Sequence, residues 1–349
     1  MNAPAPDSLA SLTTLRVGGA ARDLFSPGTR DELVATALEV WASGDDWCAL
    51  GGGSNVVVAD SGFDGSVIRI LTRGIEVFPT ATSGRTALRV QAGEPWDDLV
   101  AGTVSNGLAG LEALSGIPGS SGAAPIQNIG AYGQDLAESL TSIDFLDYES
   151  GEVLTLAASE LELGYRTSAM KRGRAGIVLS LDLAVSDAVG LSAPIAYEQL
   201  AGALGVSLGA QVPVAQVRDT VLALRQSKGM LLDPLDADSV SAGSFFTNPI
   251  VSEKFARSLP WNAPRFAVEP DSVKLSAAWL IERAGIRRGF ALPGARAAIS
   301  AKHTLALVNR GGASATEIYQ LARYIQERVR NEFGVTLVPE PVYLGVDLG

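Results

Sequence analysis

Residues 107–133 form a long stretch dominated by small residues, including Gly116-Ile117-Pro118-Gly119-Ser120-Ser121-Gly122 and Asn128-Ile129-Gly130-Ala131-Tyr132-Gly133. A connection of this length without regular secondary structure is uncommon inside a compact domain, where it is usually functional or disordered. The stretch carries little charge and contains interspersed leucine and isoleucine, which is not the composition of a solvated linker. We therefore predict an ordered loop that binds a ligand.

A second glycine cluster, Gly51-Gly52-Gly53-Ser54-Asn55, lies between two predicted strands at 47–50 and 56–59. Consecutive backbone N–H groups in such a turn suit a phosphate, although a plain tight turn is an equally good interpretation of these residues alone. The spacing fits neither a Rossmann fingerprint nor a P-loop, and a strand rather than a helix follows. ATP hydrolysis and Rossmann-type dinucleotide binding therefore lose support.

The size and composition indicate a folded protein of two or three packed parts. The chain has 349 residues, of which 47% are hydrophobic and 19% charged. Single cores rarely grow beyond roughly 250 to 300 residues. The formal net charge of −11 would repel nucleic acid and anionic membrane surfaces, so we expect neither as a partner. A small phosphorylated ligand in a locally basic cleft remains compatible with this charge.

The chain contains one cysteine, Cys48, and one histidine, His303. It can therefore form no internal disulfide and no metal site rich in thiolates or imidazoles, and we expect no metal. Residues 1–10 show no signal-peptide pattern and no apolar run reaches the roughly 18 residues of a membrane span, so we expect a cytoplasmic protein. The chemistry must come from a cofactor or from other acids and bases.

Helix signals are clearest in four places. Pro95 leads into a helix that stops near Gly107, and Pro213 opens a helix to about Ser227. A third helix is predicted over 274–284, and the capping box Ser314-Ala315-Thr316-Glu317 starts a long one that Gly334 ends. Strands are predicted over 47–50, 56–59, 66–71, 88–92, 142–148, 153–156, 177–185 and 303–309, with a last, edge strand over 335–344.

The order of the glycine turn, Ala92-Gly93-Glu94-Pro95-Trp96 and the long small-residue block resembles the FAD-binding part of the vanillyl-alcohol-oxidase-like flavoproteins. The resemblance implies that the turn holds the pyrophosphate of FAD and that the later block lies against its ribityl chain and ring system. Neither region contains histidine or cysteine, so we expect the FAD to be non-covalent. The implied cofactor-binding residues are Gly51, Gly52, Gly53, Ser54, Asn55, Gly116, Ile117, Pro118, Gly119, Ser121, Gly122, Asn128, Gly130, Ala131, Tyr132 and Gly133.

Motifs that follow one another along the chain narrow the resemblance further. They are Thr13-Thr14-Leu15-Arg16-Val17-Gly18-Gly19, Gly116-Ile117-Pro118-Gly119, Gln127-Asn128-Ile129-Gly130-Ala131-Tyr132-Gly133, Gly164-Tyr165-Arg166, Ala193-Pro194-Ile195-Ala196-Tyr197, Gly243-Ser244-Phe245-Phe246-Thr247-Asn248-Pro249 and Pro339-Glu340. Over nearly its whole length the chain resembles the UDP-N-acetylenolpyruvoylglucosamine reductases of the longer subtype, whose extra tyrosine-bearing loop the segment 193–197 resembles. The resemblance implies reduction of UDP-N-acetylglucosamine enolpyruvate to UDP-N-acetylmuramate in peptidoglycan precursor synthesis, with NADPH as co-substrate and hydride passing from flavin N5 to C3.

The resemblance implies three catalytic residues: Arg166, Ser244 and Glu340. A guanidinium stays charged and can grip a carboxylate with two parallel hydrogen bonds, which suits Arg166 to the enolpyruvyl carboxylate. Ser244 matches the serine that protonates C2, and Glu340 matches the carboxyl group that stabilises the enol-like intermediate. Without the resemblance, Arg166 and Glu340 would be interpreted as surface residues and Ser244 as part of a turn.

For substrate binding the resemblance implies Tyr165, Tyr197, Lys228 and Asn248, with Tyr197 and Lys228 on the diphosphate. A lysine is a compact point charge that suits a phosphate contact. A lone histidine at the start of a strand is more often structural than catalytic, so we leave His303 out of the catalytic set.

These inferences predict an α+β protein with a two-part FAD-binding region of the vanillyl-alcohol-oxidase-like type and a C-terminal α+β substrate-binding domain. The predicted domains are 1–74 with 334–349, 75–232, and 233–333, the last strand returning to the first domain, and we expect a monomer. Two alternatives stay open: a flavin oxidase of the same fold, and a non-catalytic sugar-nucleotide binder.

Overall fold

The computed structural model describes residues 8–80, 84–187 and 189–345, which form two compact units. Unit 1 comprises Met1–Ala20, Ser54–Phe63 and Lys228–Gly349, and unit 2 comprises Ala21–Gly53 and Asp64–Ser227. The three-domain division suggested by the sequence stays a prediction, and residues 1–7 and 346–349, which it includes, lie outside the described residues. Of residues 1–10, in which the sequence shows no signal-peptide pattern, the structure describes only 8–10. In the part of the chain that is described, no helix is both long and apolar enough to cross a membrane.

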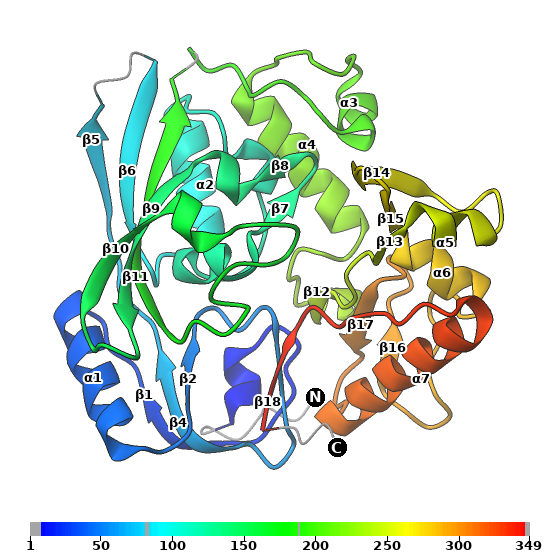
Figure 1. Ribbon diagram of the computed structural model, residues 1–349, viewed down its shortest axis with the longest axis horizontal. Helices are drawn as coiled ribbons and strands as arrows, with labels where there is room; N and C mark the ends of the chain where they lie inside the picture. Colours follow the sequence, from blue (N-terminus) through cyan, green and yellow to red (C-terminus); the bar gives the residue numbers. More distant parts are fainter. Residues whose placement is uncertain (1–7, 81–83, 188, 346–349) are drawn as a thin grey trace. The chain divides into compact units, whose positions relative to one another are not determined.

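A five-stranded antiparallel sheet is the main layer of unit 2 (Figure 1). Its central strand β11 carries a nearly continuous apolar run because both faces are covered. Ile177 and Leu179 pack in a core shared with the first helix, whereas Val178 and Leu181 pack in a core shared with the second. In spatial order the strands are β10 (Val153–Ala157), β9 (Leu140–Asp147), β11 (Gly176–Ser186), β6 (Arg85–Gln91) and β5 (Ile75–Pro79).

A second, three-stranded sheet of unit 2 leads into the glycine turn. Strand β2 (Trp47–Leu50) runs parallel to β4 (Phe63–Arg69), and β1 (Ala21–Phe25) lies on the other side of β4. Helix α1 (Arg30–Ser43) packs against this region, and a capping box between Thr29 and Glu32 fixes its start. Because β2 ends at Leu50, the glycine turn starts at the edge of this layer.

Three further helices of unit 2 surround the small-residue block. Helix α2 (Trp96–Ser105) buries Trp96 and Leu99 in the same core as β6 and β11. Helices α3 (Glu198–Leu204) and α4 (Val214–Ser227) form a satellite core with Ala113 from the block. The block itself folds into short turns, of which the longest is a 3-10 helix over Ser121–Gln127. The predicted ordered loop is therefore confirmed as packed structure.

Unit 1 contains two three-stranded sheets and a long C-terminal helix. One sheet has the order β12 (Ser241–Ser244), β17 (Ala306–Asn309), β16 (Ala297–Ile299), and the other β13 (Ile250–Ser252), β15 (Ser272–Leu275), β14 (Arg265–Glu269). Helix α7 (Ala315–Phe333) starts at the predicted capping box and ends at Gly334. It packs on β16, β17 and α6 (Ala277–Arg283), as Figure 1 shows. The remaining helix, α5 (Glu253–Ser258), is short.

Several predicted elements have other bounds in the structure, and for three of them the fold shows the reason. The helix predicted from Lys274 begins only at Ala277, because Lys274 belongs to β15 and Ser276 caps the helix. The strand predicted from His303 begins at Ala306, since a hydrogen bond from the His303 N–H to the Ser300 hydroxyl first forms a turn. The last strand is only β18 (Val342–Leu344), parallel to β3 (Val56–Val58), because the preceding prolines cannot donate ladder bonds.

Candidate active site

The glycine turn after β2 packs directly against the small-residue block. A Cβ atom on Gly52 would lie 2.7 Å from the Cα of Gly119, and one on Gly51 would collide with the Ser120 hydroxyl. Gly53 has a φ of 60°, which side-chain-bearing residues rarely adopt. Glycine is therefore required here because two loops approach each other closely. The same glycines can serve both this packing and the predicted contact with a phosphate.

The peptide groups on both sides of Gly116 are held by charged side chains. Its N–H donates to Asp97 Oδ1 at 2.6 Å, and its carbonyl accepts from Arg225 Nε at 3.0 Å. Asp97 in turn accepts a two-pronged contact from Arg218, at 2.6 and 2.9 Å. Arg218 and Arg225 lie two turns apart on α4, so one helix face fixes the start of the block. The Arg225 guanidinium is buried, and burial lowers its pKa.

The middle of the block contains a buried hydroxyl that the described residues leave without a hydrogen-bond partner. Ser121 is fully buried and its N–H donates to the Glu94 carbonyl at 2.8 Å, but its Oγ has no partner among the described residues. Next to it, a Cβ on Gly122 would lie 2.5 Å from Cβ of Ala92. Buried polar atoms are usually bonded, so an unpaired hydroxyl on a predicted cofactor residue fits a polar ligand.

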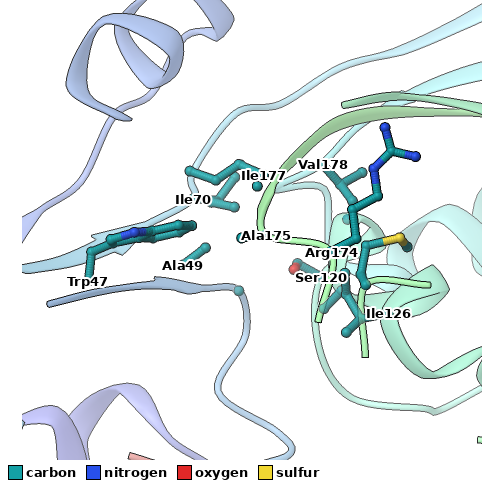
Figure 2. A pocket seen from close by; sticks show the side chains of 14 residues that line it. Trp47, Ala49, Ile70, Ser120, Ile126, Arg174, Ala175, Ile177 and Val178 are labelled. Atoms are coloured by element: carbon teal, nitrogen blue, oxygen red, sulfur yellow. The ribbon is translucent and has the colours of Figure 1, made fainter. Parts of the chain in front are cut away.

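A cavity of about 260 Å³ lies beside these loops (Figure 2). Trp47 and Ala49 line it from β2, and Ser120 and Ile126 lie on the opposite side. Gly51 and Gly122 also line it, so two predicted cofactor residues are part of its wall. The Arg174 side chain contributes as well, while its guanidinium pairs with Asp147 at 3.4 Å. The cavity is thus largely apolar and borders the predicted pyrophosphate turn.

Arg166 is fixed on the backbone of the same block. Its Nη1 donates to the Asn128 carbonyl at 3.1 Å and its Nη2 to the Gly130 carbonyl, while the guanidinium lies 5.6 Å from the centroid of the Tyr165 ring. The Asn128 amide donates back to the Gly164 carbonyl at 3.2 Å. Arg166 and two predicted cofactor-binding residues, Asn128 and Gly130, therefore form one hydrogen-bonded assembly.

Three residues of this assembly have left-handed backbone conformations. The φ angles are 54° for Arg166, 43° for Asn128 and 48° for Tyr132. Such conformations cost about 1 to 3 kcal/mol each in residues other than glycine and concentrate at functional sites, where the surroundings enforce them. Their occurrence in residues singled out by motif alone supports the assignment of this region as a site.

Tyr132 connects the block to residues 193–197, the segment that resembles the tyrosine loop of the family's longer subtype. Its ring lies 6.0 Å from that of Tyr197, in an edge-to-face arrangement. Burial raises the pKa of Tyr132, although the nearby Arg225 opposes this effect. The Gly133 Cα is so close to the loop that a Cβ there would lie 3.1 Å from that of Ala196. Tyr197 itself is 47% exposed at the start of α3. The loop is thus docked on predicted flavin-binding residues.

Unit 1 brings Ser244 and Glu340 onto adjacent backbone segments. The Glu340 N–H donates to the carbonyl of Phe245, the residue after Ser244, at 2.9 Å. The Asn55 amide donates to the Glu340 carbonyl at 3.2 Å, and the Asn55 carbonyl accepts from Val342 at 2.9 Å. Ser244 Oγ lies 3.4 Å from His303 Nε2, so the residue left out of the catalytic set touches a member of it.

The other predicted residues are placed as follows. Asn248 accepts from the Ala277 N–H at 2.9 Å and so caps α6, and Lys228 directly follows α4. Ser54 and Asn55 belong to unit 1, whereas Gly51–Gly53 belong to unit 2. Within the block, Pro118 is exposed, Ile117 is half-buried, and Gly130 and Ala131 form the short strand β7 (Gly130–Ala131). Tyr165 and Arg166 belong to unit 2, and Ser244 and Glu340 to unit 1.

Two domain families and several known proteins match this chain. Residues 22–157 match an FAD binding domain, and residues 233–344 match the C-terminal domain of UDP-N-acetylenolpyruvoylglucosamine reductase. The UDP-N-acetylenolpyruvoylglucosamine reductase of Leifsonia xyli subsp. xyli is 59% identical over 376 residues, covering 98% of this chain and 99% of that protein. The chain belongs to the UDP-N-acetylenolpyruvoylglucosamine reductase family.

Further matches support this membership. The UDP-N-acetylenolpyruvoylglucosamine reductase of Saccharopolyspora erythraea is 48% identical, with 96% of this chain and 94% of that protein covered. The crystal structure of the enzyme from Thermus caldophilus aligns with a TM-score of 0.64 at 26% identity, covering 97% of each chain. The predicted family, fold class and FAD cofactor are confirmed, and the chain is an FAD-dependent oxidoreductase.

Sequence reasoning missed several residues that this family member places at the site. Trp47, Ile70 and Ile177 line the cavity, and none belongs to a recognised motif. Arg225 belongs to none of the recognised motifs, although its spacing of seven residues from Arg218 is a usable helix-face signal. His303 was noticed and set aside, and only the fold shows its contact with Ser244.

Proposed function

We propose that the protein reduces UDP-N-acetylglucosamine enolpyruvate to UDP-N-acetylmuramate with NADPH, in the synthesis of peptidoglycan precursors. Family membership supports the reaction and the substrate class. The structural observation that carries the residue assignment is the anchoring of Arg166 on Asn128 and Gly130, which ties the charged group to the cofactor block. When bound, FAD supplies a hydride acceptor for NADPH and a hydride donor for the substrate.

The residues that would hold FAD fit such a ligand. At Gly51, Gly52 and Gly122 the surrounding residues leave no room for a Cβ atom, and glycine-rich backbone of this kind suits a pyrophosphate. The Ser121 hydroxyl is a buried group for which a ligand would be the partner. The network of Asp97, Arg218 and Arg225 fixes Gly116 before any ligand arrives, so less ordering is needed on binding.

Arg166 would bind the enolpyruvyl carboxylate and stabilise the charge that develops there during hydride addition. Two carbonyl acceptors already fix the orientation of its guanidinium, so less ordering of this side chain would be needed when the substrate binds. The left-handed backbone of Arg166, with a φ of 54°, costs conformational free energy, and the benefit of holding the guanidinium in place would offset this cost.

Ser244 would donate the proton to C2, and Glu340 would stabilise the enol-like state from the neighbouring segment. The Phe245–Glu340 backbone hydrogen bond fixes the separation of the two segments. A serine hydroxyl is a weak acid, so the 3.4 Å contact with His303 supports a role for a neighbour that orients it. Tyr197, Lys228 and Asn248 would bind the sugar nucleotide, and Tyr165 would line the same site.

An anaerobic titration tests the proposal. NADPH should bleach the flavin absorbance of the purified protein, and UDP-N-acetylglucosamine enolpyruvate should then restore it, in two separate steps. Rapid recovery with oxygen instead of the enolpyruvyl substrate would identify a flavin oxidase, and a colourless protein that cannot bind FAD would refute the proposal altogether. A cytoplasmic location, supported by the single cysteine, and a monomeric state complete the proposal, and light scattering tests the latter.

A further inference from the structure

Glu112 is a buried carboxylate that bonds two distant parts of the chain. It is the first residue of the 3-10 helix over Glu112–Leu114 in the small-residue block, and it is only 1% exposed. Its Oε2 accepts from the Gly110 N–H at 2.6 Å, and its Oε1 accepts from the Ala193 N–H at 2.7 Å. A buried carboxylate is costly unless it is hydrogen-bonded, and its charge makes such bonds short and strong. Glu112 therefore ties the block firmly to residue 193.

The base of segment 193–197 is also fixed from a second side. The Ser192 N–H donates to the Val212 carbonyl at 2.7 Å, and the Ser192 hydroxyl accepts from the Val212 N–H at 3.2 Å. Ile195 is 4% exposed and packs in the satellite core with α3 and α4. Tyr197, in contrast, is exposed at the end of the segment. The segment is thus held at its base by several contacts, while its tyrosine stays accessible to a ligand.

A carboxylate is suited to position 112 because both of its oxygens accept. A glutamine amide of the same shape offers one acceptor oxygen and one NH2 donor. In Glu112→Gln an NH2 group would therefore face one of the two N–H groups, and one contact must be lost. Gly110 lies two residues away in the chain and Ala193 81 residues away, so the contact with Ala193 is the one we expect to break.

We propose that Glu112 is a positioning residue for Tyr197, and that it raises the affinity for the sugar nucleotide by fixing the base of segment 193–197. The inference rests on the proposed binding of the substrate diphosphate by Tyr197. Pro194 has a fixed φ, so the placement of Ala193 constrains the direction in which the segment continues towards Tyr197. A segment that is held before the ligand arrives loses less conformational entropy on binding. Loss of the Glu112 contact therefore weakens binding of the substrate.

The test measures binding of UDP-N-acetylglucosamine enolpyruvate to the oxidised, FAD-containing protein by calorimetry, without NADPH. Glu112→Gln should weaken this binding about 10-fold, as expected for loss of one hydrogen bond to a charged group. In steady-state kinetics KM for this substrate should rise with kcat within about twofold, because the lost contact serves ground state and transition state alike. The FAD dissociation constant should change by less than about twofold, because the retained bond to Gly110 preserves the block.

Gln134→Ala is the matched control. Gln134 is also buried, at 7% exposed, and its Oε1 accepts from the Ala113 N–H at 2.8 Å, one residue after Glu112. The variant therefore disturbs the same part of the block without removing the bond to Ala193. It should leave the substrate affinity unchanged, even where it lowers the stability of the fold.

A second variant guards against misfolding of Glu112→Gln. Ser192→Ala removes the hydroxyl that accepts from the Val212 N–H, so it loosens the same base from the other side, and it should also weaken binding of the substrate but not of FAD. Unchanged substrate affinity in the folded variants, equal losses for FAD and substrate, or the same loss in Gln134→Ala would overturn the inference. Wild-type protein that fails to bind the enolpyruvyl substrate would refute the proposed function instead, so the two failures are distinguishable.

Discussion

The hydroxyl of Ser244 lies 3.4 Å from Nε2 of His303. Ser244 ends strand β12, and His303 belongs to the turn before β17, the strand that pairs with β12. The His303 N–H is held by the Ser300 hydroxyl at 3.2 Å, so the turn is fixed independently of the imidazole. The sheet therefore places an imidazole beside the proposed proton donor, and the two side chains can be tested separately.

Ser244→Ala should separate the two half-reactions. Reduction of FAD by NADPH should stay near the wild-type rate, because the hydroxyl serves only the proton transfer to C2. Reoxidation by the enolpyruvyl substrate should slow by at least about 100-fold, the usual contribution of a positioned acid or base. Anaerobic stopped-flow absorbance measures both steps. Equal impairment of the two would remove Ser244 from the proposed role.

His303→Asn should give a smaller effect of the same kind. The imidazole touches the hydroxyl and would only orient it, so we expect about a tenfold slower substrate step, below the full contribution of the acid, with normal flavin reduction. Arg257→Ala, an exposed change on α5, is a suitable control. If the Ser244→Ala and His303→Asn effects multiply in the double variant, the two residues act independently and the orienting role is wrong.

The sequence predicted several helix and strand boundaries correctly, because glycines, capping residues and prolines act on the backbone next to them. Strand β2 has the predicted bounds, α4 ends as predicted, and the capping box of Ser314 and Glu317 starts α7. Errors came where a neighbouring strand decides the outcome. Lys274 pairs with Ile250 in a sheet, and this tertiary pairing overrides the helical tendency of the segment.

Contacts between distant segments could not be predicted from sequence. The aromatic contacts of Trp41 and Trp47 with Tyr148 join two consecutive elements, α1 and β2, to a residue far along the chain. The sequence predicted a tight glycine turn, but only the fold shows that Gly51 and Gly52 of this turn pack against Gly119 and Ser120. Sequence motifs therefore identify candidate site residues, whereas the fold shows which tertiary contacts position them.

Arg166→Lys should inactivate the substrate step. A lysine keeps the charge but cannot bond both the Asn128 and Gly130 carbonyls and a carboxylate with a planar fork. We expect at least a 100-fold loss of kcat/KM, equivalent to about 2.7 kcal/mol of transition-state stabilisation. Steady-state kinetics measure it, and Arg172→Lys, at an exposed ion pair with Glu162, is the matched control. Normal turnover would exclude Arg166 from the mechanism.

Asp97→Asn should make the free energy of unfolding less dependent on pH in the acid range. Burial acts to raise the Asp97 pKa, but hydrogen bonds from Arg218 and Gly116 outweigh it, so the pKa lies below its ordinary value. The charged contacts therefore stabilise the fold above about pH 4, the ordinary aspartate range, and are lost as pH falls through the lowered pKa.

At pH 7 we expect the Asp97→Asn variant to lose about 1.5 kcal/mol of unfolding free energy, the low end for bonds to a charged group, because the carboxyl is partly exposed. The difference from wild type should shrink towards pH 3. Urea unfolding across this range measures it, with Asp64→Asn, at a carboxylate 95% exposed, as control. A difference that does not change with pH would show that the Asp97 charge contributes nothing.

Asn55→Ala distinguishes two roles for the last residue of the glycine turn. The family resemblance assigns Asn55 to the cofactor, whereas the fold uses its amide to hold the Glu340 carbonyl at 3.2 Å. If the structural bond dominates, the variant should lose about 1 kcal/mol of unfolding free energy and slow the substrate half-reaction, because the Glu340 segment is less well fixed. The FAD dissociation constant should then change little. A large loss of FAD affinity with a normal substrate step would instead show that the amide serves the cofactor. Thr247→Ala is the control, because it removes only the long 3.4 Å contact from the Thr247 hydroxyl to the Val338 carbonyl on the neighbouring segment.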